Sequence, residues 1–169
     1  MLTPSYAVGL FTAILKDQGY RVDLFDCTPY LATHEFLKEP LPVTRANSLL
    51  NSRQFDAQSL FGDPKTDLLG DFKNKLNEFK PNAIVFSTVC EDTWPQVKEL
   101  VGVLSGYPDI KSIIGGVYGT MAGEDMISYP GVYCVGQGEG EKTIVEFCES
   151  VRNGTSISEI QGTLIKDDQ

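Results

Sequence analysis

The apolar run at residues 83–88, AIVFST, constrains the fold more than any other part of the sequence. A strand that is apolar on both faces has to be covered on both faces, which is typical of parallel sheets flanked by helices. Patterns with apolar residues at helical spacing precede and follow this run, at 66–80 and 93–106. The run therefore predicts a buried strand in an α/β domain.

The same alternation of strand and helix continues along the chain. Further strands are predicted at 20–26, 110–116, 132–138 and 162–166, and further helices at 6–17, 122–129 and 141–154. Elements that alternate at this spacing form a parallel sheet with right-handed crossovers and helices on both faces. We therefore expect a doubly wound, flavodoxin-like or Rossmann-like α/β fold, in one domain over residues 1–169.

Residues 33–66 interrupt this regular pattern. The segment contains three prolines together with asparagines and serines, and only short helices near 46–50 and 53–60 are indicated. Irregular stretches of this length in a compact domain are usually functional loops or mobile segments.

Composition excludes several classes of partner. The net charge is −9 and no stretch concentrates Lys and Arg, so neither a nucleic acid nor a membrane surface is an expected partner. No apolar run approaches the roughly 20 residues that span a bilayer, and no signal peptide is recognisable, which favours the cytoplasm.

The four cysteines are scattered and predict reduced, mostly buried thiols, while the one histidine, His34, lies in a polar region. We predict no metal site and no catalytic residue.

Ligands of doubly wound sheets bind outside the carboxyl ends of the strands. In this chain those ends are 26–28, 87–90, 115–118 and 136–141, and they carry glycines and small hydroxyls rather than acids, bases or nucleophiles. Two interpretations remain open for the glycines: they make tight turns, or they leave bare backbone for a ligand. The second interpretation predicts a site that recognises its ligand by shape.

Familiar nucleotide and phosphate motifs do not match these strand ends. GQGEGE at 136–141 comes late in the chain and carries two carboxylates, so it is not a dinucleotide-binding fingerprint. Ser87 has no histidine near it in the sequence, and it stands where a phosphoacceptor domain would carry an aspartate.

Several segments in a fixed order carry a resemblance to a known family. They are PSYAVGLFTAILKDQGYRVDLFD, KPNAIVFST, IKSIIGGVYGT, GVYCVGQGEGEKTIVEF and a late IQG, and they cover most of the chain outside 33–66. The chain resembles the cobalamin-binding domain that precedes the radical S-adenosylmethionine domain in corrinoid-dependent enzymes. Those enzymes include anaerobic magnesium-protoporphyrin IX monomethyl ester cyclases and various methyltransferases.

The resemblance implies a cobalamin whose nucleotide tail is inserted at the strand ends. Ser87 would lie beside the dimethylbenzimidazole, Gly115 and Gly116 would lie along the tail, and residues 138–140 would form the far loop. The full set of residues expected to contact the cofactor is Ser87, Thr88, Val89, Gly115, Gly116, Val117, Tyr118, Gly136, Gly138, Glu139 and Gly140.

Three departures from the family pattern shape what we expect. The D-x-H-x-x-G signature is absent, so the cobalt would lack a histidine ligand. The C-x-x-x-C-x-x-C motif is absent too, so S-adenosylmethionine and a 4Fe-4S cluster would belong to a downstream radical domain that also acts on the small-molecule substrate. The chain is therefore expected to be the N-terminal piece of a longer enzyme and not catalytic alone. The family's first strand is missing as well, and the exposed sheet edge makes a homodimer plausible.

Two alternatives to a cobalamin module remain at this point. The chain could keep the fold without binding cobalamin and serve as a scaffold or interaction domain. It could also be an unrelated flavodoxin-like domain that binds another small ligand.

Overall fold

The computed structural model describes residues 6–30, 63, 65–89 and 91–166. The chain divides into two compact units, one formed by Met1–Asp23 and Leu76–Gln169 and the other by Leu24–Lys75. The short helices predicted near 46–50 and 53–60 lie outside the described residues. The expectation of a single domain over 1–169 stays a prediction.

The first unit contains a four-stranded sheet in the order β1-β2-β3-β4. Its strands are β1 (Ala83–Ser87), β2 (Lys111–Gly115), β3 (Cys134–Gly136) and β4 (Thr163–Ile165). β1, β2 and β3 are parallel, as the continuous apolar runs predict, and the α/β fold class is confirmed.

The last strand runs opposite to the others, which corrects the expectation of an entirely parallel sheet. β4 pairs antiparallel with β3, with Gly136 opposite Thr163. After α9 (Gly140–Asn153) the chain returns toward the carboxyl end of β3, and Ile157 and Ile160 enter the core on the way. Because this segment crosses the sheet a second time after α9, β4 starts beside the carboxyl end of β3 and runs antiparallel to it.

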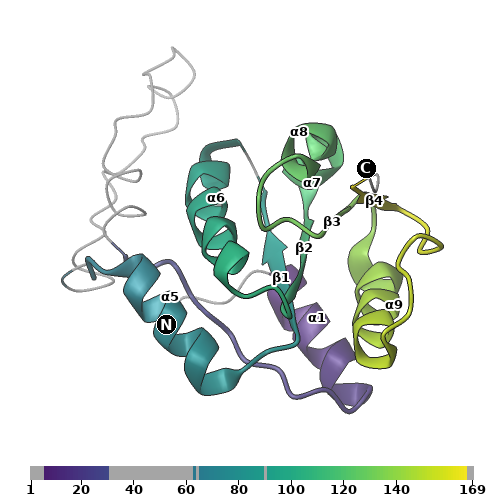
Figure 1. Ribbon diagram of the computed structural model, residues 1–169, viewed down its shortest axis with the longest axis horizontal. Helices are drawn as coiled ribbons and strands as arrows, with labels where there is room; N and C mark the ends of the chain where they lie inside the picture. The colour runs from purple at the N-terminus through teal and green to yellow at the C-terminus, as the bar shows by residue number, and fades with distance from the viewer. Residues whose placement is uncertain (1–5, 31–62, 64, 90, 167–169) are drawn as a thin grey trace, which may run out of the picture. The chain divides into compact units, whose positions relative to one another are not determined.

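Helices cover both faces of this sheet, as predicted (Figure 1). On one side, α1 (Tyr6–Asp17) and α9 pack together, and their apolar residues form a core with residues of β2 and β3. That core consists of Leu15, Ile113, Cys134, Ile144, Phe147, Cys148, Ile157 and Ile160.

The other face is covered by three helices, α6 (Trp94–Val103), α7 (Val117–Met121) and α8 (Gly123–Ile127). Ile114 and Val135 are fully buried there, as are residues of α6 and α8. The short helix α7 was not predicted, because five residues that follow two glycines show no helical periodicity.

Most helix boundaries follow the sequence signals. α1 ends at Asp17, and Gly19 (φ 80°) follows it in the left-handed conformation typical of helix ends. The N–H groups of residues 19 and 20 donate to the carbonyls of Lys16 and Leu15. Asp67 directly precedes α5 (Leu68–Phe79), and its carboxylate accepts a hydrogen bond from the Gly70 N–H at 2.8 Å. Thr93 precedes α6 as predicted, but its side chain makes no capping hydrogen bond.

The strand predicted at 20–26 is wrong. These residues are described, and none of them is part of a strand. In the described sheet β1 is the outermost strand, and no described strand pairs with residues 20–26. Leu24 in this segment is half exposed.

The second unit is held by contacts around Tyr30. The buried Tyr30 hydroxyl donates to the Asp71 carboxylate at 2.8 Å, and Lys65 Nζ lies 3.5 Å from the same oxygen. Tyr30 and Lys65 also form an isolated parallel bridge. These contacts hold the two ends of the intervening segment side by side.

None of the described helices is long and apolar enough to cross a lipid bilayer.

Candidate ligand-binding site

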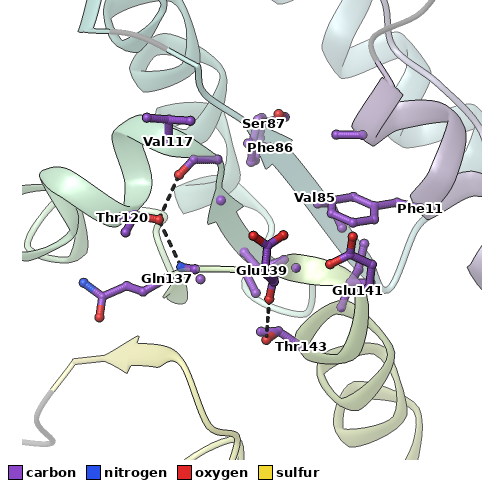
Figure 2. Close-up of a pocket in the computed structure, with 18 of the residues that line it drawn as sticks. Phe11, Val85, Phe86, Ser87, Val117, Thr120, Gln137, Glu139, Glu141 and Thr143 are labelled. Carbon is purple, nitrogen blue, oxygen red and sulfur yellow. Dashed lines mark hydrogen bonds between the residues drawn. The ribbon is translucent and has the colours of Figure 1, made fainter.

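A pocket of about 450 Å³ opens at the carboxyl ends of β1, β2 and β3 (Figure 2). Its walls come from α1, from the three strand ends, from α7 and from the first turn of α9. The volume lies within the range of roughly 300–1,000 Å³ that is common for small-ligand sites. The pocket therefore occupies the edge at which doubly wound sheets bind ligands.

Most of the predicted site residues meet in this pocket. Ser87, Gly115, Gly116, Val117, Gly136, Gly138, Glu139 and Gly140 line it. Thr88, Val89 and Tyr118 are not among the lining residues. Thr88 is fully buried, and its N–H and hydroxyl both donate to the Gly115 carbonyl, at 2.8 and 3.2 Å. Thr88 thus joins the ends of β1 and β2.

Gly116 is required by the protein's own backbone. Its φ of 102° and ψ of −178° lie in a region that is essentially restricted to glycine. A Cβ at this position would also collide with the carbonyl oxygen of Thr88. Of the two interpretations of the glycine pair, the tight turn explains Gly116 completely.

Gly115 is different, because nothing in the protein requires a glycine there. A Cβ on Gly115 would meet no atom within 4 Å, and its φ lies outside the range that disfavours other residues. The residue lines the pocket at the end of β2. The bare backbone at Gly115 therefore leaves space that no other part of the described chain fills.

One aromatic wall of the pocket was missed by sequence reasoning. Phe11 comes from α1, and a Cβ at Gly140 would lie only 2.6 Å from the end of its ring. Glycine at the start of α9 thus lets the Phe11 ring approach the helix (Figure 2). The sequence shows Phe11 only as part of an apolar helical face, which gives no signal for a pocket.

Thr120 fixes the loop that follows β3, and it too was not predicted. Its hydroxyl donates to the Gly116 carbonyl at 3.2 Å and accepts a hydrogen bond from the Gly138 N–H at 3.0 Å (Figure 2). The two bonds tie α7 and the turn after β2 to the loop before α9. They hold the glycine-rich loop in place without a bound ligand.

The charged side chains that line the pocket are acidic. Among the described residues that line the pocket, Glu139 and Glu141 are the only ones with a charged side chain, and none is a lysine, arginine or histidine. Among the described residues, no group of three or more His, Cys, Asp or Glu side chains could hold a metal ion. The pocket can enclose an apolar or neutral group, and its hydroxyls offer hydrogen bonds.

No cysteine is among the described residues that line this pocket. Cys134 and Cys148 are buried, and burial raises the pKa of the Cys134 thiol to about 12 and that of Cys148 to about 11. Burial also raises the pKa of the less buried Cys27 to about 11, with a contribution from Asp26. Cys90 lies outside the described residues.

Comparison with known proteins gives one match. The family model described as the B12 binding domain matches residues 28–148, which is more than two thirds of the chain. The matched range includes β1, β2, β3 and the first part of α9, but not α1. No curated protein and no solved structure matches the chain.

Proposed function

The chain belongs to the family of B12-binding domains, and from this premise we propose that its glycine-lined pocket holds the nucleotide tail of cobalamin. The observation that carries this proposal is Gly115. Its missing side chain is explained neither by backbone conformation nor by packing, and it borders the pocket. A flat aromatic base needs a slot of this kind, without a side chain in it.

The shape of the site fits a part of cobalamin rather than all of it. A pocket of about 450 Å³ is too small for a whole corrinoid, so the neutral base of the tail would enter, and the anionic phosphate of the tail and the corrin ring would remain at the mouth. Phe11, Gly115 and Ser87 would enclose the tail. At the mouth, the side chains of Val117 and Met121 are 60% and 79% exposed, and they offer an apolar surface to the ring.

The chain's own residues bind and orient the cofactor, while the cobalt supplies the chemistry when cobalamin is bound. Burying the tail would fix the orientation of the ring and keep water from the base. The described pocket lining offers no imidazole, and the D-x-H-x-x-G signature is absent from the sequence. The residues that would hold the tail are therefore apolar side chains, glycines and hydroxyls rather than a histidine of that signature.

The partner of this module would be a radical S-adenosylmethionine domain. This part of the proposal is supported by the segments that resemble such enzymes, among them IKSIIGGVYGT and GQGEGEKTIVEF. The partner would bring S-adenosylmethionine and a 4Fe-4S cluster, and together the two would carry out methyl transfer or oxidative ring formation on a small molecule in the cytoplasm. The B12-binding chain would present the corrinoid and perform no catalytic step itself.

A second candidate function is a scaffold with the same fold and no cobalamin. It is favoured by one observation, the position of β1 as the outermost strand of the described sheet. An uncovered edge strand can pair with another chain, including a second copy.

A corrinoid titration separates the two functions. The purified chain is mixed with hydroxocobalamin or methylcobalamin, free ligand is removed by gel filtration, and the visible spectrum of the protein fraction is recorded. We expect about one corrinoid per chain, with the spectrum of a cobalt that has lost its tail base. A protein fraction without corrinoid would reject the cobalamin proposal and leave the scaffold.

The proposed partnership has its own test. Co-expression of the chain with a candidate radical S-adenosylmethionine domain, followed by affinity purification through a tag on one of them, should recover both. Reading the coding sequence beyond residue 169 for C-x-x-x-C-x-x-C is a simpler check on a covalent connection. If the purification recovers only the tagged protein and the coding sequence has no such motif, the proposed radical S-adenosylmethionine partner is rejected. The result of the corrinoid titration is independent of both tests.

A further inference from the structure

The pocket lies against the face of the sheet that α1 and α9 cover. Val85 of β1 is in register with Ile113 of β2, and Ser87 is in register with Gly115, so all four positions face the same side of the sheet. All four line the pocket, and Ile113 also belongs to the core shared with α1 and α9. The strands therefore contribute two rows to the pocket, an outer row of Ser87 and Gly115 and an inner row of Val85 and Ile113.

The inner row and the wall that α1 supplies are apolar. Val85 is 38% exposed, so it can contact a ligand, whereas Ile113 is only 4% exposed. Leu10 and Phe11 of α1 add an alkyl side chain and an aromatic ring to the lining (Figure 2). A ligand group that passes the bare backbone of Gly115 therefore meets hydrocarbon surface.

The hydroxyls of the lining offer few hydrogen-bond donors to such a group. The Thr120 hydroxyl donates to the Gly116 carbonyl at 3.2 Å, and the Thr143 hydroxyl donates to the Glu139 carbonyl at 3.5 Å. Their protons are thus committed to the backbone. Ser87 places its hydroxyl on the outer row, beyond Val85 on the same strand.

The other polar side chains of the described lining do not supply a donor to the inner row either. Tyr6 is 83% exposed, and Figure 2 shows the Gln137 amide directed away from Phe11. Glu139 and Glu141 are exposed, and ionised carboxylates only accept hydrogen bonds. A ring nitrogen of a ligand is an acceptor too, so these carboxylates cannot replace the water that it loses.

Corrinoids with a nucleotide tail differ in the base that the tail carries. Cobalamin has dimethylbenzimidazole, whose outer ring is hydrocarbon and bears two methyl groups. Adenine has a similar bicyclic shape, but it carries two more ring nitrogens and an amino group. Burial of these polar groups against hydrocarbon without hydrogen-bond partners costs free energy.

We propose that this pocket is selective for corrinoids whose tail base is apolar, such as dimethylbenzimidazole, over corrinoids whose tail base is adenine. This inference rests on the proposed function, and it adds the substrate class that the site accepts. Loss of the methyl contacts and burial of an unpaired ring nitrogen together predict a preference of about tenfold.

The cobalt does not produce this preference by itself. The base has to leave the cobalt before it can enter the pocket. Adenine is the weaker ligand of the two and leaves more readily, so this step alone favours the adenine corrinoid. Tighter binding of cobalamin would therefore report the contacts of the base with the pocket.

The test measures dissociation constants by equilibrium dialysis with visible absorbance for three corrinoids. They are cobalamin, its analogue with adenine as the tail base, and its analogue with p-cresol, a phenolic base that cannot coordinate cobalt. The wild-type chain should bind cobalamin about tenfold more tightly than the adenine analogue. The p-cresol analogue should also bind more tightly than the adenine analogue, because its base is apolar and is already free.

Val85→Thr keeps the shape of the side chain and places a hydroxyl on the inner row. This variant should lose most of the preference, because the hydroxyl can pair with a ring nitrogen and contacts the methyl groups less favourably. Val89→Thr is the matched control, since Val89 is 64% exposed near the end of the same strand and is not among the lining residues. It should keep the tenfold preference. Circular dichroism spectra that match the wild type establish that both variants are folded.

Each outcome decides the inference. Equal binding of cobalamin and the adenine analogue by the wild type overturns the selectivity while leaving corrinoid binding intact. A preference that persists unchanged in Val85→Thr shows that the inner row does not discriminate, and it also overturns the inference. Absence of binding to all three corrinoids rejects the proposed function, and with it this inference.

Discussion

The adjacent glycines at the end of β2 should respond in opposite ways to substitution. Gly116 is held at a φ of 102° against the Thr88 carbonyl, whereas a Cβ on Gly115 meets nothing within 4 Å. We therefore expect Gly116→Ala to destabilise the fold. We expect Gly115→Val to leave the fold stable and to weaken cobalamin binding.

The size of the effect at Gly116 follows from two costs. Placing a residue with a Cβ in this backbone region costs about 1–3 kcal/mol. Relief of the collision moves Thr88 and weakens its two hydrogen bonds to the Gly115 carbonyl, and losing about half of the strength of each adds about 1 kcal/mol. The sum is about 2–4 kcal/mol, and at about 2–4 °C per kcal/mol for a chain of this length the Tm should fall by about 5–15 °C.

At Gly115 the expected change lies in binding rather than in stability. Valine suits a strand better than glycine by up to about 1 kcal/mol, so the Tm should stay the same or rise slightly. Its methyl groups would occupy the space proposed for the nucleotide tail, and at least a tenfold loss of affinity is expected from the displaced contacts.

Thermal unfolding by circular dichroism without ligand, followed by corrinoid titration of each folded variant, measures both effects. Gly115→Ala is a graded control, since its single methyl group should weaken binding less than the valine. Wild-type affinity in Gly115→Val would refute the assignment of this space to the ligand. A Tm of Gly116→Ala equal to that of the wild type would refute the argument from the Thr88 contact.

Two further predictions concern the aromatic wall and the buried thiols. Gly140→Ala places a Cβ about 2.6 Å from the Phe11 ring and should lower the free energy of urea unfolding by about 1–3 kcal/mol. Phe11→Leu should relieve most of this loss, and additive effects of the two substitutions in a double-mutant cycle would contradict the contact. Burial raises the pKa of the Cys134 thiol from 9.0 to about 12, so its stabilising contribution is complete below pH 9 and is lost as the pH rises toward 12. Urea unfolding at pH 8 and 10.5 should show this loss in the wild type and a smaller one in Cys134→Ala, and an equal loss in both would contradict it.

The sequence predicts those elements of the fold that carry their own local signals. α1 extends over the predicted range, and α5, β1 and α9 match theirs to within two residues, because helical periodicity, capping residues and apolar runs are local properties. The strand at 20–26 fails for a different reason. Its residues have strand-like alternation, but a strand exists only where a neighbouring strand can pair with it, and no neighbour is described there. The direction of β4 is equally non-local, because it depends on the path of the chain after α9.

The glycine pair shows why the candidate site could be located from the sequence but not resolved into roles. Gly115 and Gly116 are indistinguishable in the sequence, and both suit either a turn or a ligand. The structure distinguishes them through Thr88, which lies 27 residues before Gly115 and is hydrogen-bonded to it at the ends of β1 and β2. The Thr88 carbonyl leaves no room for a Cβ on Gly116, whereas a Cβ on Gly115 would meet no atom. Gly116 then belongs to the architecture, since any chain that makes this turn beside β1 needs it, with or without a cofactor. Gly115 is the position at which selection for a ligand can be detected, because the fold alone would accept a larger residue there.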